Sequence, residues 1–269
     1  MCLQRLISKM LKIVFNQKRF FIKYPQTLVS VLVTLLLCAG LVSANAETLY
    51  VGTDTAFVPF EYKGADGRYT GFDIELWDAI AKKIGVEYEL RPMDFNGLLP
   101  GLATGVLDVA LAAIFITPER EKMIDFSIPY FKAGLKVMVL SKNTDIHQTA
   151  DLKGKVVAVK MGTATVKYVA SLKPAQMKKF PNIDQAYLEV LTGGADAAMH
   201  DTPNVLYFIK TAGKGRVKAV GAEVEAAEYG IAFPKGSAIR GKVDIALREM
   251  MKNGEYNLLY RKWFGTDPE

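Results

Sequence analysis

Short apolar runs alternate along the chain with segments whose apolar residues recur at helical spacing. Residues 49–53, 107–114 and 155–160 have the continuous apolar character of strands that are buried on both faces. Residues 72–84 place apolar side chains four residues apart, which is typical of a helix with one buried face, and Gly85 follows as a common helix stop. This alternation of strands and helices predicts an α/β fold.

The remaining elements are expected from the same patterns. Asp73 is the candidate N-cap of the first helix, and Thr117 followed by Pro118 predicts the start of another helix. Further helices are expected over residues 95–104, 163–172, 182–191, 204–211, 239–252 and 256–263, and further strands over 88–91, 137–140, 196–199, 217–220 and 231–233.

The chain shows no internal repeat, low-complexity tract or long linker. Short stretches near residues 130–134 and 225–229 divide the pattern into a middle part and two flanking parts. The sequence therefore predicts two compact lobes, with two crossings of the chain between them.

The first 46 residues have the order of a secretory signal peptide. Basic residues lie between Arg5 and Lys23, an apolar run covers residues 28–42, and a small-x-small cleavage motif, Ala-Asn-Ala, stands at 44–46. We therefore expect residues 1–46 to be removed on export. The alternative is a retained membrane anchor, although the apolar run is about 15 residues long and a spanning helix needs ~20.

The positive net charge of the chain resides in this N-terminal segment. Six of the 34 basic residues lie in residues 1–46, which hold no acidic residue, so the other 28 basic residues balance the 28 acidic ones. The formal net charge of +6 is therefore no sign of a basic domain, and we expect no nucleic-acid partner.

Catalytic and metal-binding signatures are missing from residues 47–269. Both cysteines, Cys2 and Cys38, precede this part, which excludes disulfides and thiolate metal sites from it. The two histidines, His147 and His200, lie far apart, and no nucleophile elbow, P-loop or dinucleotide fingerprint occurs. We expect neither a cofactor nor a metal.

Polar residues follow the carboxyl ends of the expected strands, where ligands bind in open α/β sheets. Two acids, one arginine and one lysine that converge there would suit a zwitterion with a polar side chain. Singly, the acids and threonines could be helix caps, and Arg120 and Lys160 could be solvated. Phe57, Phe95 and Phe115 could belong to the core. The polar candidates at these ends are Asp54, Thr117, Arg120, Lys160, Thr163, His200 and Asp201.

Longer motifs make the pattern more specific. They are residues 54–62 (DTAFVPFEY), 71–85 (GFDIELWDAIAKKIG), 93–102 (MDFNGLLPGL), 116–121 (ITPERE), 124–130 (IDFSIPY), 200–213 (HDTPNVLYFIKTAG), 229–237 (YGIAFPKGS) and 260–265 (YRKWFG). In these motifs the chain resembles the periplasmic substrate-binding proteins of polar amino acid ABC transporters, and within that family the glutamine-binding members. The resemblance extends over essentially all of residues 47–269.

The resemblance implies a two-lobed, type II periplasmic binding protein fold. Lobe 1 would comprise residues 47–129 and 230–269, and lobe 2 residues 130–229, with hinges near 130–134 and 225–229. Such a protein would be a periplasmic monomer that closes on a polar L-amino acid, glutamine in the first place. It would then deliver the amino acid to an inner-membrane ABC permease.

The resemblance also implies how the backbone of the amino acid would be held. Arg120 would bind the α-carboxylate as a bidentate fork, and Asp201 would bind the α-ammonium group. Backbone N–H groups near Thr163 and Ala164 would assist at a helix N-terminus.

The other candidates would contact the side chain of the ligand. Asp54 would accept a hydrogen bond from a side-chain amide, Lys160 would donate one to its carbonyl, and His200 would line that end. Phe57 and Phe95 would sandwich the aliphatic stem.

Four positions depart from the pattern of the glutamine binders. Ala113 and Phe115 stand where those proteins have Gly and Thr, so a hydroxyl expected near the ligand ammonium is replaced by an aromatic ring. Ala164 replaces a Gly and Met161 a Ser beside the carboxylate-binding backbone. These departures leave the identity of the polar amino acid open.

Two other functions remain alternatives at this level. Some relatives on this scaffold are periplasmic dehydratases similar to cyclohexadienyl dehydratase, and the altered residue Phe115 would fit a changed pocket. A sensory amino acid binding module, held by an uncleaved N-terminus, is the other alternative.

Overall fold

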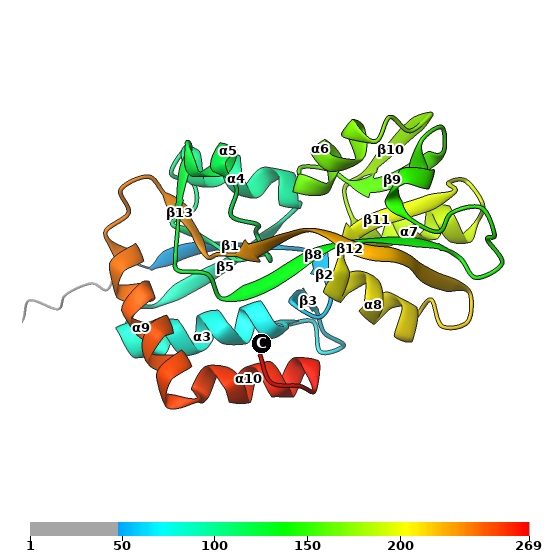
Figure 1. Ribbon diagram of the computed structural model, residues 1–269. Coiled ribbons are helices and arrows are strands. Elements are labelled where there is room, and N and C mark those ends of the chain that lie inside the picture. Colours follow the sequence, from blue (N-terminus) through cyan, green and yellow to red (C-terminus); the bar gives the residue numbers. More distant parts are fainter. Residues whose placement is uncertain (1–47, 269) are drawn as a thin grey trace, which may run out of the picture. The chain divides into compact units, whose positions relative to one another are not determined.

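Two five-stranded sheets organise the residues that the computed structural model describes, 48–268 (Figure 1). All of these lie in one compact unit, and the expected signal peptide, residues 1–46, is outside the described range. The first sheet has the order β5 (Tyr88–Met93), β1 (Leu49–Asp54), β6 (Val109–Ala110), β13 (Ala232–Pro234) and β7 (Ile124–Phe126). The second has the order β10 (Gln176–Phe180), β9 (Val156–Lys160), β11 (Ala197–Asp201), β8 (Phe131–Leu140) and β12 (Val217–Tyr229).

Each sheet combines three parallel strands with antiparallel neighbours. β1 runs parallel to β5 and β6, and β9 runs parallel to β10 and β11. The carboxyl ends of β1, β9 and β11 therefore carry Asp54, Lys160 and Asp201 at the positions where such sheets bind ligands. The expected α/β class is confirmed.

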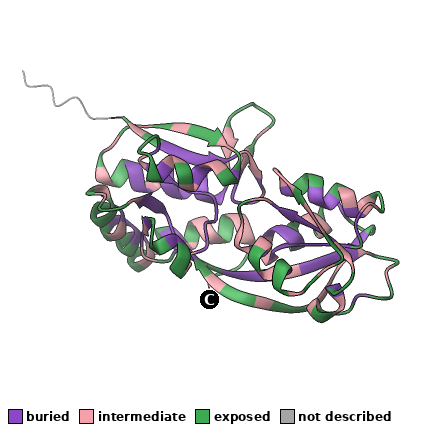
Figure 2. Cartoon of the chain, turned by 90° about the horizontal axis from the view of Figure 1, so that it is seen from above, coloured by how far each residue is buried: buried purple, intermediate pink, exposed green. Residues whose placement is uncertain are grey.

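Helices cover the two large sheets, and the structure also has a small third sheet. The helices are α3 (Phe72–Ile84), α4 (Phe95–Ala103), α5 (Pro118–Glu121), α6 (Ala164–Ser171), α7 (Ile183–Leu191), α8 (Thr202–Lys210), α9 (Ile239–Asn253) and α10 (Glu255–Phe264), with a 3-10 turn η1 (Thr149–Leu152). The small sheet consists of β2 (Ala56–Phe57), β3 (Glu61–Lys63) and β4 (Tyr69–Thr70). Buried residues gather in the strands and on the inner helix faces (Figure 2). No helix within residues 48–268 is long and apolar enough to cross a membrane.

β8 and β12 form a long antiparallel ribbon that includes both predicted crossings. Phe131 pairs with Tyr229 at one end and Leu140 with Val217 at the other. The register shifts twice in between, and Glu225 has a φ of 52°. Both strands are longer than the sequence predicts. In β12 the added part is largely exposed or half-buried, and its polar residues break the apolar pattern.

An aromatic cluster fixes the end of this ribbon. The ring of Phe131 lies 5.1 Å from Phe60, 5.5 Å from Tyr229 and 5.0 Å from Phe264. Phe72 of α3 packs against the same group at 5.2 Å from Phe264. All of these rings are buried except that of Phe264, which is half-buried, and aromatic rings at these separations attract one another. The ribbon is therefore anchored against α3 and α10.

The predicted N-cap role of Asp73 is wrong. Gly71 occupies the N-cap of α3 with a φ of 136°, and the amides of Phe72 and Asp73 donate to the carbonyls of Pro59 and Phe60. These backbone acceptors satisfy the helix start, so Asp73 is free to lie inside the first turn, fully buried.

Two other expectations need correction. The apolar run 107–114 forms only the short strand β6, because Ala113 adopts a φ of 45° and turns the chain away. β10 was not expected, since its two lysines interrupt the apolar pattern of this edge strand.

Gly71→Ala should destabilise the protein by more than about 2 kcal/mol. An added Cβ would lie 2.0 Å from the carbonyl oxygen of Phe60, and the backbone conformation is one that L residues avoid. Urea unfolding measures the loss. Gly85→Ala is the matched control: its φ is 69° but nothing lies within 4 Å, so it should cost only about 1 kcal/mol. Equal losses in the two variants would contradict the steric argument.

Candidate functional site

A partly open cavity lies at the carboxyl ends of β1, β9 and β11. The structure brings the candidate site residues expected from the sequence to this cavity, except Thr117, and it adds Ala112. Their contacts with a ligand remain a prediction. The lining residues are Asp54, Phe57, Phe95, Ala112, Ala113, Phe115, Arg120, Lys160, Thr163, Ala164, His200 and Asp201.

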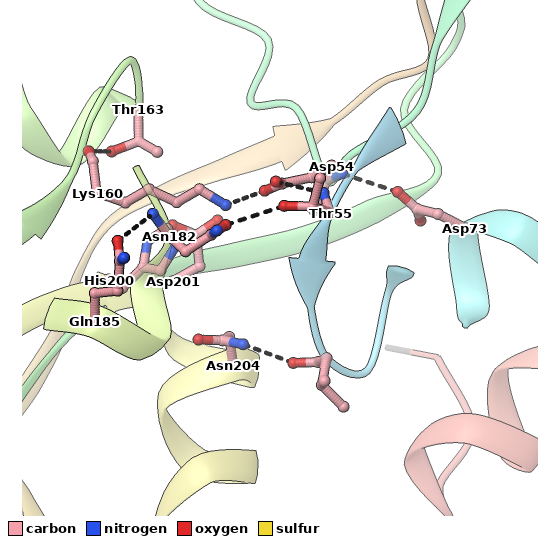
Figure 3. Close-up of polar contacts among 12 residues, drawn as sticks. Asp54, Thr55, Asp73, Lys160, Thr163, Asn182, Gln185, His200, Asp201 and Asn204 are labelled. Atoms are coloured by element: carbon pink, nitrogen blue, oxygen red, sulfur yellow. Dashed lines mark hydrogen bonds and ion pairs between the residues drawn. The ribbon is translucent and has the colours of Figure 1, made fainter. Parts of the chain in front are cut away.

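Asp54 and Lys160 form an ion pair across the cavity (Figure 3). Asp54 ends β1 in the first sheet and Lys160 ends β9 in the second, and each side chain is 1% exposed. The other oxygen of Asp54 accepts a hydrogen bond from the amide of Thr55 at 2.7 Å. Because a buried charge is tolerated only with a partner, each of these side chains holds the other in place.

Arg120 is a buried cation without a carboxylate partner within residues 48–268. Thr117 caps its short helix as predicted, accepting from the amide of Arg120 at 3.3 Å. The guanidinium donates to the carbonyl oxygens of Phe115 at 2.8 Å and Gly162 at 3.3 Å. Burial lowers its pKa to about 10, and the negative charge of Asp201 opposes this shift. Such a group is suited to binding an anion.

Asp201 is a buried anion with one oxygen engaged and one available. Its Oδ2 accepts from the hydroxyl of Tyr229 at 2.6 Å, whereas Oδ1 has no hydrogen-bond donor among the described residues. The Nδ1 atom of His200 lies 3.0 Å from Oδ1 but outside hydrogen-bonding geometry. Since an unsatisfied buried carboxylate oxygen is costly, Asp201 is suited to accept from a cationic ligand group.

Aromatic side chains form the apolar walls. Phe57 lies with its ring centre 5.1 Å from that of His200, and Lys160 Nζ is 5.5 Å from the Phe57 ring and 5.8 Å from that of Phe95. The ring of Phe115 is 4.7 Å from that of Tyr229. These rings exclude water and so strengthen every charge interaction in the cavity.

The backbone turn at Ala113 depends on Asp73. The amide of Ala113 donates to Asp73 Oδ2 at 2.8 Å, and the same oxygen accepts from Tyr130 at 2.8 Å. Burial raises the pKa of Asp73 to about 7, although both hydrogen bonds act in the opposite direction. Asp73 thus supports the cavity from behind and links it to Tyr130, immediately before β8.

Glu61 is another buried acid, and sequence analysis did not identify it. Its side chain is fully buried, and neither carboxylate oxygen has a hydrogen-bond partner within residues 48–268. Burial, with the negative charge of Asp73 as the next contribution, raises the pKa of Glu61 well above its ordinary value. No local motif distinguishes this residue, because its burial depends on segments far away in sequence. Among the described residues no group of three or more His, Cys, Asp or Glu side chains could hold a metal ion.

The fold and this cavity define a two-sheet binding protein, and comparison with known proteins identifies its family. Residues 49–266 match the model of the bacterial extracellular solute-binding proteins, family 3, and the chain belongs to that family. Its structural neighbours are type II periplasmic binding proteins, which confirms the fold expected from the resemblance.

Several relatives are named for an amino acid that they bind. The chain is 33% identical over 223 residues to the L-cystine-binding protein TcyJ of Escherichia coli strain K12, covering 82% of this chain and 84% of that relative. It is 43% identical to an ancestral arginine-binding protein bound to glutamine, with a TM-score of 0.78 over 81% of this chain and 98% of that one. An ancestral amino acid-binding protein, a precursor of cyclohexadienyl dehydratase, is 39% identical with a TM-score of 0.75 over 81% and 95% of the two chains.

Glu61→Gln should flatten part of the pH dependence of stability. Because the folded-state pKa of Glu61 is raised, its stabilising contribution is fully present below about 4.5 and is lost as pH rises toward the folded value. Above about pH 4.5, the wild type should therefore lose up to about 1.4 kcal/mol per pH unit relative to the variant. Denaturant unfolding at pH 5, 6, 7 and 8 measures this difference. A difference that does not change with pH would contradict the assignment.

Proposed function

We propose that the protein captures a polar L-amino acid, glutamine in particular, in the periplasm and delivers it to an inner-membrane ABC permease. The observation that carries this proposal is the presence of Arg120 and Asp201 in one cavity, each buried and neither neutralised by the other at ion-pair distance. A free amino acid presents one carboxylate and one ammonium group, so it would satisfy both side chains at once.

The backbone of the ligand would lie between these two charges. Arg120 would donate to the α-carboxylate, with the start of α6 at Thr163 and Ala164 beside it. Asp201 would accept from the α-ammonium through Oδ1, while Tyr229 retains Oδ2. Both bonds are charge-assisted and shielded from water, which makes them strong.

The side-chain end would discriminate through Asp54 and Lys160. An amide can enter between them, its NH₂ donating to Asp54 and its carbonyl accepting from Lys160, with His200 alongside. A cationic side chain would meet Lys160 as a like charge, and a carboxylate would meet Asp54. Both unfavourable encounters support a neutral amide as the ligand, even though relatives are named for arginine and cystine.

Capture would involve movement of two lobes. We assign residues 47–129 and 230–269 to lobe 1 and residues 130–229 to lobe 2, with the hinges at 130–134 and 225–229 in the β8–β12 ribbon. The register shifts in this ribbon leave places where the backbone can bend. A ligand bound by Arg120 and Asp201 favours closure because it contacts both lobes only when they are together.

The dehydratase alternative would need a side chain that is free to move a proton beside the substrate. Asp54 is paired with Lys160, and Asp201 is held by Tyr229 and placed for an ammonium group. His200 alone among these candidates has ring nitrogens without a hydrogen-bond partner within residues 48–268, and its ring packs on Phe57 at the side-chain end of the cavity. The pair Arg120 and Asp201 fits an amino acid better than a cyclic carboxylate without an amino group. Binding is therefore the function that we propose.

Thermal-shift screening of residues 47–269 against the common amino acids and cystine tests this function. A ligand at 100 times its Kd adds about 2.7 kcal/mol of stability, which is readily detected. Glutamine should give the largest shift. No shift with any amino acid would overturn the proposal.

Arg120→Ala and Asp201→Asn should each weaken glutamine binding by at least roughly thirtyfold. Each change leaves a buried ligand charge unpaired, which costs about 2–5 kcal/mol. Isothermal calorimetry measures the loss, and Arg68→Ala, at an exposed ion pair, should leave affinity unchanged. Retained affinity in both site variants would place the ligand elsewhere.

Glutamine should bind more tightly than glutamate by at least about tenfold, or ~1.4 kcal/mol. A glutamate side chain would bring its negative charge against Asp54 in a cavity that excludes water. Competition calorimetry with glutamine, glutamate, asparagine and arginine measures the order. Equal affinities for glutamine and glutamate would remove the assigned role of Asp54 and Lys160, and a preference for a smaller amino acid would indicate that Phe115 fills this end.

A further inference from the structure

Two asparagine side chains outside the cavity lining contact the segment that follows β1. Asn182, which precedes α7, accepts a hydrogen bond from the hydroxyl of Thr55 at 3.2 Å (Figure 3). Asn204, in the first turn of α8, donates to the carbonyl of Val58 at 2.7 Å. Both bonds connect elements beside the second sheet with residues 55–58, which lead from the first sheet into the small sheet.

The side-chain amide of Asn204 is fixed in the orientation in which it donates to Val58. Its Oδ1 accepts from the hydroxyl of Tyr187 at 2.7 Å, and the Tyr187 ring packs 4.5 Å from that of Phe208. The carbonyl of Val58 can only accept, so the amide nitrogen must face it. Asn204 is 4% exposed and Tyr187 fully buried, which means that the donor is fixed with little remaining freedom.

Asn182 is also positioned by its own helix. Its backbone amide donates to Oε1 of Gln185 at 3.3 Å, which fixes the start of α7. The side-chain oxygen is then directed to Thr55, whose amide is in turn held by Asp54 at 2.7 Å. Thr55 therefore connects the buried ion pair with the start of α7.

Phe57, a residue of the cavity wall, lies within the segment that these two hydrogen bonds hold. It lies between Thr55 and Val58, lines the cavity and packs 5.1 Å from the ring of His200. Residues on both sides of Phe57 are thus tied to α7 and α8. The two asparagines therefore connect this wall of the cavity to α7 and α8, although neither of them lines the cavity.

We propose that Asn182 and Asn204 form an asparagine latch that retains the bound amino acid by slowing its escape. This inference rests on the proposed function. In terms of the assigned lobes, Thr55 and Val58 belong to lobe 1 and both asparagines to lobe 2, so these bonds exist only when the lobes are together. Loss of either bond therefore speeds reopening and leaves the encounter with ligand unchanged.

The test is stopped-flow measurement of kon and koff with L-glutamine for the wild type and for Asn204→Ala and Thr55→Val. A neutral hydrogen bond contributes enough to change an equilibrium by roughly threefold to tenfold. Each variant should raise koff by about that factor with kon unchanged within about twofold. Thr55→Ser, which keeps the hydroxyl, is the matched control and should retain the wild-type koff.

Tyr187→Phe is a second variant that tests the same contact if Asn204→Ala does not fold. It removes the hydroxyl that orients Asn204 while keeping the buried ring, so it should raise koff by a smaller factor. Unfolding without amino acid shows that each variant is folded. If the wild type binds glutamine and the folded variants keep the wild-type koff, the latch is overturned but the proposed function is not. The same conclusion follows if Thr55→Ser raises koff as much as Thr55→Val does. If the wild type binds none of glutamine, arginine and cystine, the proposed function fails and the latch with it.

Discussion

The structure depends on charges that are buried where the carboxyl ends of the two sheets meet. Asp54, Lys160, Arg120 and Asp201 are each at most 7% exposed. Removing such groups from water is expensive, and the protein reduces the cost directly only for Asp54 and Lys160, which pair with each other. Arg120 instead donates hydrogen bonds to two backbone carbonyls, and Asp201 accepts one from a tyrosine hydroxyl, so the hydrogen-bonding capacity of each is only partly used. The free energy still to be gained at these two groups is what a zwitterion can supply.

The ribbon between the sheets is connected to both sides of this charged site. Immediately before β8, Tyr130 donates to Asp73, which holds the amide of Ala113 at the cavity. At the same end of the ribbon, Tyr229 of β12 donates to Asp201. The two tyrosines lie side by side, since the amide of Tyr130 donates to the carbonyl of Tyr229 at 3.0 Å. A change in the ribbon would therefore move groups that line the cavity, and the proposed bending would be coupled to the proposed binding in this way.

Sequence patterns predicted the elements whose reasons are local. Continuous apolar strands and capped helix starts place Asp54, Lys160 and Thr117 correctly, because each follows from its immediate neighbours. The edge strands β10 and β12 were missed or shortened, since an exposed edge carries polar residues. The resemblance in the longer motifs added Phe57, Phe95 and Ala164, which periodicity alone would assign to the core or to a helix.

Residues that depend on distant contacts could not be found in this way. Asp73 resembles an N-cap by position, but backbone carbonyls from residues 59 and 60 already satisfy the helix start. Glu61 and Tyr229 stand in strands as ordinary polar and aromatic residues, and only the packing of remote segments buries them beside the site. Their importance comes from tertiary structure, so no spacing rule reveals it.

The substitutions at Ala113 and Phe115 show how the same turn can be kept with different side chains. Ala113 takes a left-handed conformation that favours glycine, at a cost of roughly 1–2 kcal/mol, and the hydrogen bond to Asp73 offsets part of it. The backbone path is therefore retained. At Phe115 the ring packs on Tyr229 and its carbonyl still accepts from Arg120, so this position supports the site through the main chain. With no hydroxyl on this side chain, Asp201 would be the principal acceptor for a ligand ammonium group in the proposed function, and the hydroxyl of Tyr229 that holds its second oxygen would be correspondingly more important.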